Sequence, residues 1–290
     1  MSARKRWADD MEAARRGART LVMGVLNVTP DSFSDGGRYF TLEKAVAHAV
    51  EMADAGAHIL DIGGESTRPA TFASNRPLPA EEELRRILPV VEALRVRLPD
   101  MPLSVDTYKA EVAQAVLERG AVLINDISAL RADSQMASVV QRFDAWVCLM
   151  HMPGLPTALP SAPHYEDVVR EVADHLRERV KSAEMAGIAP HKILIDPGIG
   201  FGKTPSQNLE ILRRLPELHQ LGYPLLVGTS RKSFIGKVLG GLPPEERLEG
   251  TAATVALAVA SGAHVVRVHD VRAMVRVVRM ADAVVRGWSG

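Results

Sequence analysis

Eight short apolar runs, each rich in Val, Ile or Leu, alternate along this chain with longer amphipathic stretches. Each run has the length of a strand and is almost continuous in apolar residues, which is typical of strands covered on both faces of a parallel sheet. Strands that alternate in this way with helical patterns indicate an α/β fold. The runs cover residues 21–26, 58–62, 102–105, 122–124, 146–150, 192–195, 225–227 and 265–268.

The stretches between the runs have the periodicity of amphipathic helices. Gly56, Gly120, Gly187 and Gly262 end four of them just before the next run, where a left-handed helix cap is favoured. The expected helices cover residues 42–55, 79–97, 109–119, 135–143, 165–186, 205–221, 244–261 and 271–286.

These strand–helix units, with no low-complexity linker between them, predict one α/β domain, a (β/α)8 TIM barrel over residues 21–290. A doubly wound open sheet uses the same alternation of elements and is the structural alternative. Residues 1–20 are expected to form a short helical or irregular extension that covers the bottom of the barrel.

The composition narrows the range of functions. The formal net charge is zero at pH 7, which disfavours attraction to nucleic acid or anionic membranes, so a bound anion has to be held by local residues. The arginines of residues 271–286 are interpreted as a solvated helix face, opposite the apolar residues of that stretch. No secretory signal or membrane-length apolar run is recognised. The single cysteine, Cys148, excludes an intramolecular disulfide, which favours a cytoplasmic protein with a small buried thiol.

Polar side chains or glycine turns follow the C-terminal end of every expected strand. In a parallel barrel these ends meet at one mouth, where active sites are built. Capping of the next helix would explain one such residue but not eight in succession. The polar ends are Asn27, Asp61, Asp106, Asn125 with Asp126, His151, Asp196, the segment 228–232, and His269 with Asp270.

Asp106, Asn125, Asp196 and Lys232 form the first expected group of functional residues. Carboxylates accept hydrogen bonds, whereas Asn supplies both a donor and an acceptor. This set suits a flat heterocycle with an amidine-like edge, such as a pterin or a purine, because each unmet partner in a dry pocket costs about 1–3 kcal/mol. The alternative is a purely structural salt bridge between Lys232 and Asp196.

Asn27, Arg68, Arg267 and His269 form the second expected group. Arginine binds phosphate through a two-pronged fork. An Asn oxygen combined with phosphate oxygens is a usual environment for Mg²⁺. Such a group would stabilise a departing pyrophosphate. The alternative for His269 is a neutral, hydrogen-bonded histidine at a strand end.

Residues 197–204 end in Gly-Lys-Thr but do not match a phosphate-binding P-loop. Pro197 stands where that motif requires glycine, and Pro205 follows directly. The glycines of this segment do not have the dinucleotide-binding spacing either. The segment is therefore assigned no nucleotide.

Eight segments, in order, closely resemble the motifs of dihydropteroate synthases, and the resemblance runs from about residue 20 to the C-terminus. The first two are the most distinctive: MGVLNVTPDSFSDGG at residues 23–37 and DIGGESTRP at residues 61–69. The others are SVDT at 104–107, INDI at 124–127, MHM at 150–152, DPGIGF at 196–201, GTSRKS at 228–233 and RVHD at 267–270.

The resemblance implies a barrel enzyme of folate biosynthesis that joins a dihydropterin pyrophosphate to 4-aminobenzoate, uses Mg²⁺, is inhibited by sulfonamides and forms a homodimer. It implies that two loops act as lids and supply Asp35 and Arg68 as catalytic residues beside Asp106 and Lys232. The implied pterin pocket consists of Asp106, Asn125, Asp196 and Lys232, with Met150 packing on the ring. The implied pyrophosphate site contains Asn27, Arg68, Arg267 and His269, with Asn27 at the metal. The implied aminobenzoate site contains Thr67, Pro69, Phe201, Lys232 and Ser233.

Two other functions stay open at this point. A folate-dependent methyltransferase also binds a pterin edge with Asp and Asn in a barrel. A silent paralogue would bind the pterin without turnover. The motifs at residues 32–37, 66–69 and 230–233 favour the synthase over the methyltransferase, and the intact Asp35, Arg68, Asp106 and Lys232 argue against the silent paralogue.

Overall fold

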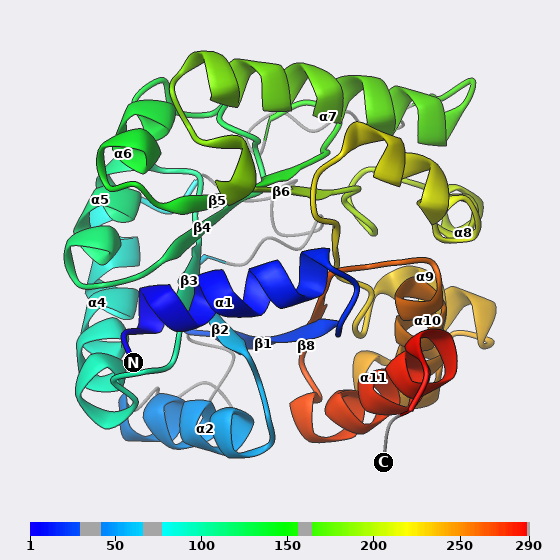
Figure 1. The fold of residues 1–290 in the computed structure, drawn as a ribbon, viewed down its shortest axis with the longest axis horizontal. Coiled ribbons are helices and arrows are strands. Elements are labelled where there is room, and N and C mark those ends of the chain that lie inside the picture. The colour runs from blue at the N-terminus through cyan, green and yellow to red at the C-terminus, as the bar shows by residue number, and fades with distance from the viewer. Residues whose placement is uncertain (30–41, 66–76, 156–163, 289–290) are drawn as a thin grey trace.

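The computed structural model describes residues 1–29, 42–65, 77–155 and 164–288, and its centre is a sheet of eight parallel strands ringed by helices (Figure 1). The order of strands in the sheet is β6-β5-β4-β3-β2-β1-β8-β7, so each strand lies beside its neighbours in sequence. The strands are β1 Leu21–Asn27, β2 Ile59–Gly63, β3 Leu103–Asp106, β4 Leu123–Asp126, β5 Trp146–Met150, β6 Ile193–Asp196, β7 Leu226–Val227 and β8 Val265–Val268.

The sheet closes on itself between β6 and β7. Ile195 forms a parallel bridge with Leu225, and its N–H donates to the carbonyl of Pro224 at 2.9 Å. Closure and the sequential strand order confirm the predicted TIM barrel and exclude the doubly wound open sheet, in which the strand order reverses at a switch point.

Each of the eight stretches expected to be helical contains a helix, but not every boundary is the expected one. The expected helix 205–221 is an α-helix followed by a 3-10 helix, because Pro216 cannot donate to the helical ladder. The expected helix 244–261 is a short 3-10 helix followed by an α-helix, and a short helix that was not expected occupies residues 233–238. The described helices are α1 Ala3–Arg15, α2 Leu42–Asp54, α4 Ala80–Arg97, α5 Ala110–Glu118, α6 Met136–Arg142, α7 Val168–Met185, η1 Pro190–Lys192, α8 Pro205–Arg213, η2 Leu215–Leu221, α9 Ser233–Val238, η3 Pro244–Glu246, α10 Leu248–Ala260 and α11 Val271–Arg286.

The apolar core has two layers, because successive side chains of a strand point to opposite faces. In β1, Val22 and Leu26 pack outward against the helices, whereas Leu21 and Met23 point into the barrel. Cys148 is fully buried among the inward-pointing residues, which confirms the expected small buried side chain. The barrel interior below the mouth is therefore a packed core rather than a channel.

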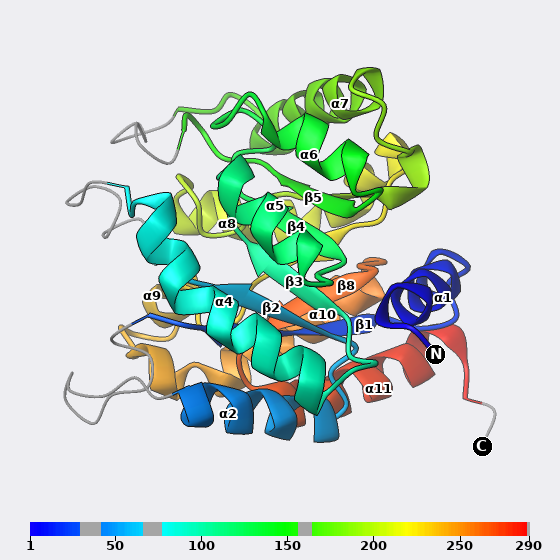
Figure 2. The same cartoon turned by 90° about the vertical axis from the view of Figure 1, so that its left-hand side faces the viewer.

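Helix α1 closes the bottom of the barrel. Trp7, Met11 and Ala14 are buried and belong to the same cluster as the inward-pointing strand residues. The Trp7 ring meets the Trp146 ring edge to face, with centroids 6.1 Å apart. Figure 2 shows α1 lying across the end of the barrel. The first twenty residues thus provide a helical cover, in the place expected for them.

The last helix differs from the sequence pattern along part of its apolar face. Val271, Met274, Val275 and Val278 of α11 are buried against the barrel. Val284, which the helical periodicity places on the same apolar face of residues 271–286, is 72% exposed. Helix α11 therefore carries apolar residues that the barrel does not cover. Within the described parts of the chain, none of the helices is both long enough and apolar enough to span a membrane.

The replacement Trp7→Ala tests whether α1 is a packed cover. We expect a loss of about 3–5 kcal/mol in the free energy of unfolding, because the change leaves a cavity where a buried aromatic ring was. The control Val96→Ala, at a side chain of α4 that is 85% exposed, should change that free energy by less than about 0.5 kcal/mol. Urea denaturation followed by circular dichroism measures both, and equal effects of the two substitutions would contradict the account.

Candidate active site

The register of the strands brings their polar C-terminal residues into one ring. Asn27 lies opposite Gly63, Gly63 opposite Asp106, and Asp106 opposite Asn125. Met150 of β5 lies opposite Asp196 of β6. Because adjacent parallel strands end together, these side chains lie at the same mouth of the barrel.

Asp61 is the centre of a hydrogen-bond network inside this mouth. Its carboxylate is fully buried and accepts hydrogen bonds from Ser104 Oγ at 2.5 Å, Asn125 Nδ2 at 3.1 Å and Arg267 Nε at 2.6 Å. Arg267 also donates from a second nitrogen to Asp106 Oδ2 at 3.0 Å. One guanidinium on β8 therefore links carboxylates from β2 and β3, and Asn125 is oriented through the same carboxylate.

Asp106 has one carboxylate oxygen to offer to a ligand. Oδ2 accepts from Arg267, whereas the buried Oδ1 has no hydrogen-bond partner among the described residues. Burial raises the pKa of Asp106 to about 7, and the charge of Arg267 opposes this shift. A buried acceptor without a partner costs free energy, so a ligand N–H that reached Oδ1 would be bound strongly.

Asp196 and Lys232 lie on the other side of the mouth. Asp196 Oδ1 accepts from the backbone N–H of Gly198 at 2.7 Å, and burial raises the pKa of Asp196. Lys232 Nζ lies 4.2 Å from the centroid of the Phe201 ring. Burial, reinforced by the charge of Arg267, lowers the pKa of Lys232 to about 8. Asp196 and Lys232, both among the described residues, form no salt bridge with each other. The purely structural salt bridge considered from the sequence is therefore absent between them.

A small apolar cluster lies among these charged groups. Tyr108, Ile127, Met150, Met152 and Phe201 are buried together, apart from the two larger core clusters. Flat apolar side chains next to carboxylate and amide groups suit an aromatic ring with a polar edge. The mouth therefore has the chemistry to stack a heterocycle and bind its N–H groups.

His269 follows β8 as a neutral hydrogen-bonded side chain. The Ser230 hydroxyl oxygen accepts from the His269 backbone N–H at 3.1 Å, and the His269 ring Nδ1 lies 3.0 Å from it. Burial and the charge of Arg267 lower the pKa of His269 to about 3. In this arrangement the hydroxyl donates to Nδ1, which leaves the Nε2–H free to donate to an anion. His269 can therefore be neutral and hydrogen-bonded, as the alternative from the sequence had it, and still bind a phosphate through Nε2–H.

Asn27 ends β1 as a half-buried side chain beside Gly63. A side chain at Gly63 would have its Cβ 3.7 Å from both Asn27 Oδ1 and Asp106 Cβ, so glycine keeps open the space between these two residues. The described residues contain no group of three or more His, Cys, Asp or Glu side chains that could hold a metal. One Asn oxygen fits Mg²⁺ that takes its remaining ligands from water and substrate phosphates.

Not every residue proposed from the sequence can be placed. Asp35, Thr67, Arg68 and Pro69 lie outside the described residues. Ser233 is exposed at the first position of α9. Among the remaining residues proposed from the sequence, the structure gathers Asn27, Asp106, Asn125, Met150, Asp196, Phe201, Lys232, Arg267 and His269 at the mouth.

Sequence reasoning assigned no partner to Asp61, although a signal for one was present. Residues 59, 61 and 63 of β2 alternate with outward residues, so Asp61 has to point into the barrel. The same alternation points Arg267 inward from β8. Two opposite charges that face inward in one small barrel have to pair, because an unpaired buried charge is too costly. Lys203, described below, is the second residue that sequence reasoning passed over.

Three comparisons agree with this geometry. The family model described as pterin binding enzyme matches residues 23–269. Dihydropteroate synthase of Bacillus subtilis is 49% identical over 265 residues, covering 91% of this chain and 88% of that protein. That of Escherichia coli K12 is 48% identical, covering 90% of each. The solved structure of Xanthomonas albilineans dihydropteroate synthase with 4-aminobenzoic acid has a TM-score of 0.85 at 49% identity, covering 92% of this chain and 94% of that one. The chain therefore belongs to the dihydropteroate synthase family of pterin-binding enzymes.

Proposed function

We propose that this protein is a transferase of folate biosynthesis, which condenses 6-hydroxymethyl-7,8-dihydropterin pyrophosphate with 4-aminobenzoate to give 7,8-dihydropteroate and pyrophosphate. The observation that carries the proposal is the buried Asp106 carboxylate, with a free oxygen, in the same network as Arg267. Solved relatives contain 4-aminobenzoic acid and 7,8-dihydropteroate, which supports these substrates.

The pterin is recognised at its polar edge. Asp106, Asn125 and Asp196 offer carboxylate and amide groups to the ring N–H and C=O groups, and Met150 packs against the ring face. Arg267 donates a hydrogen bond to Asp61, and Asn125 donates to the same carboxylate at 3.1 Å. The polar edge of the pterin therefore binds side chains that are already oriented. Preorganised partners of this kind bind without the cost of ordering them in the complex.

The pyrophosphate leaves from the positive side of the mouth. Arg267 and the Nε2–H of His269 receive the anion, and we assign Asn27 and Arg68 to the same group. Asn27 would hold Mg²⁺, which would supply further positive charge to the leaving group. The carbon–oxygen bond breaks with its electron pair on the pyrophosphate, and the positive charge that grows on the pterin methylene is stabilised by Asp106.

The amine of 4-aminobenzoate then attacks that methylene. Its lone pair forms the carbon–nitrogen bond, and its proton passes to the departing pyrophosphate. We assign Phe201, Lys232 and Ser233 to this substrate, with Thr67 and Pro69, and expect sulfonamides to compete for the same place. Asp35 is assigned to the lid over the reaction. The catalysis is electrostatic and positional and requires no covalent enzyme intermediate.

An assay of pyrophosphate release from the dihydropterin substrate tests the reaction itself. We expect release to require both 4-aminobenzoate and Mg²⁺ and to produce 7,8-dihydropteroate. A folate-dependent methyltransferase would leave the pyrophosphate compound unchanged. A silent paralogue would bind that compound without forming dihydropteroate, so either of these results overturns the proposal.

The replacement Asp106→Asn tests the role of the free carboxylate oxygen. We expect kcat/KM to fall by about 10²–10³-fold, because the amide cannot stabilise a cation and presents a donor to the pterin edge. The control Asp174→Asn removes an exposed carboxylate of α7 that pairs with Arg177, and it should retain wild-type turnover in the same steady-state assay. Wild-type turnover in Asp106→Asn would remove Asp106 from the mechanism.

The pH profile of kcat/KM follows from the shifted pKa values of Asp106 and Lys232. Activity requires the Asp106 carboxylate, whose pKa is raised to about 7, so kcat/KM should decline as the pH falls through that value. Activity also requires the Lys232 ammonium, whose pKa is lowered to about 8, so kcat/KM should decline as the pH rises above it. We expect a bell-shaped profile that loses its alkaline limb in Lys232→Arg, and a flat profile from pH 6 to 9 would refute this assignment.

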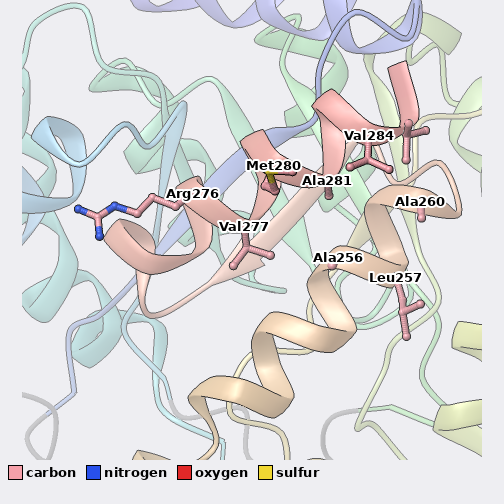
Figure 3. A pocket seen from close by; sticks show the side chains of 9 residues that line it. Ala256, Leu257, Ala260, Arg276, Val277, Met280, Ala281 and Val284 are labelled. Atoms are coloured by element: carbon pink, nitrogen blue, oxygen red, sulfur yellow. The ribbon is translucent and has the colours of Figure 1, made fainter. Parts of the chain in front are cut away.

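We further propose that the protein is a homodimer, placed in the cytoplasm as its single buried thiol suggests. Helices α10 and α11 pack together and share an apolar groove of about 610 Å³ (Figure 3). Leu257 is 60% exposed, Met280 66% and Val284 72%. Among the described residues that line the groove, Arg276 is the one with a charge. A contiguous apolar face of this kind indicates an interface, and a second copy covers it by a two-fold pairing of like faces.

The replacement Met280→Glu tests the homodimer. Burying an unpaired carboxylate in the interface is costly, so we expect sedimentation equilibrium to give the mass of one chain for this variant and of two chains for the wild type. The control Val96→Glu places the same charge on an exposed side chain of α4 and should remain dimeric. A wild-type protein that sediments as a monomer at micromolar concentration would contradict the proposal.

A further inference from the structure

The proposed reaction does not use Lys203. Its side chain nevertheless has three hydrogen-bond partners. Its Nζ donates to the carbonyl oxygens of Gly198 at 2.9 Å and Phe201 at 3.1 Å, and it lies 2.9 Å from His151 Nδ1. An ammonium group has three N–H donors, and each of them is directed here to one acceptor. The site is therefore built for a charged lysine.

His151 is the acceptor that ties Lys203 to the neighbouring strand. It follows β5, whereas Lys203 lies in the segment after β6. Because Nδ1 accepts from the ammonium, the ring is neutral and carries its proton on Nε2. Burial and the charge of Lys203 lower the pKa of His151, so the lysine is the protonated partner of the pair, and burial lowers the pKa of Lys203 as well, to about 7. The contact thus joins the ends of β5 and β6 above the barrel.

The backbone that Lys203 holds has no room to move toward either neighbour. Gly198 and Gly200 have φ values of +68° and +83°. A Cβ on Gly198 would lie 1.9 Å from the carbonyl oxygen of His151, and one on Gly200 would lie 2.8 Å from Lys232 Cδ. The segment 197–202 is therefore pressed between the end of β5 and the side chain of Lys232.

This segment carries groups that face the mouth. The Phe201 ring lies under the ammonium of Lys232, and the Gly198 N–H donates to Asp196. Lys203 binds the carbonyls of Gly198 and Phe201, so it fixes the backbone at both of these positions. Asn208 supports the middle of the segment through the Gly200 N–H, at 2.7 Å from its Oδ1.

We propose that Lys203 is a positioning residue for the amine substrate, because its ammonium fastens the segment 197–202 to the end of β5 and so sets the Phe201 ring against Lys232. Of the groups in this segment, Phe201 is the side chain assigned to 4-aminobenzoate. Of the pterin-binding side chains, Asp106, Asn125, Met150 and Asp196 are carried by strands β3 to β6, whereas Lys232 follows β7 and packs against this segment. The inference rests on the proposed synthase function.

The test is Lys203→Met in the full chain, with kcat and KM measured for each substrate. We expect kcat/KM for 4-aminobenzoate to fall by about 10–10²-fold, because a reacting partner is displaced. The KM for the dihydropterin pyrophosphate should change by less than about threefold, because its partners on β3 to β6 stay in place. The control is Lys192→Met, since Lys192 also donates to a backbone carbonyl, that of Asp144 at 2.8 Å, but at the bottom of the barrel. The control should leave both constants at their wild-type values.

A double-mutant cycle with Phe201→Leu separates positioning from a loss of stability. If Lys203 acts through the Phe201 ring, Lys203→Met should cost little further kcat/KM in a chain that already lacks the ring. Additive effects, equal losses for both substrates, or an unchanged kcat/KM in Lys203→Met would each overturn the inference. Should Lys203→Met not fold, Lys203→Gln, which can still donate to both carbonyls, is expected to show a smaller loss with the same substrate preference. A wild-type chain that forms no dihydropteroate would instead refute the proposed function.

Discussion

The Arg267 guanidinium, buried between the carboxylates of Asp61 and Asp106, is the interaction on which the rest of the mouth depends. Asp61 is completely buried, and a lone charge there would cost several kcal/mol. The pair becomes possible because β1 lies between β8 and β2 in the sheet, which brings residues 206 positions apart to within 2.6 Å. The pairing of β8, β1 and β2 therefore builds this part of the site, and loss of either charge leaves the other without compensation.

The mouth carries groups that suit both ends of a bipolar substrate. Asp106 and Asp196 supply carboxylates, and burial raises the pKa of both. His269 and the remaining donors of Arg267 can receive an anion. A substrate with a ring at one end and a pyrophosphate at the other fits this combination of groups. The protein thus stabilises charge separation with groups that are already in place.

The sequence predicted the eight strands because each buried parallel strand is an almost uninterrupted apolar run, and the polar residue after each run marked the mouth. It did not predict the breaks at residues 214 and 247 or the short helix α9, since one or two turns leave little periodic signal. Asp61 was recognised as a strand end without its partner, because pairing across strands depends on register. Lys203 was passed over when the P-loop was rejected, although its ammonium is bound within its own segment. Asp106, Asn125, Met150 and Asp196 could be placed at the mouth from the sequence because each lies at the C-terminal end of its strand.

The central claim is that Asp106, Asn125, Asp196 and Arg267 form one preorganised pocket for a pterin. A crystal structure of the protein with a dihydropterin bound tests this most directly. The account predicts that the ring lies against Met150 and that one of its N–H groups donates to Asp106 Oδ1, while Asp61 keeps its hydrogen bonds to Asn125 and Arg267. A pterin bound elsewhere, or an Asp106 Oδ1 still without a partner in the complex, would contradict the account.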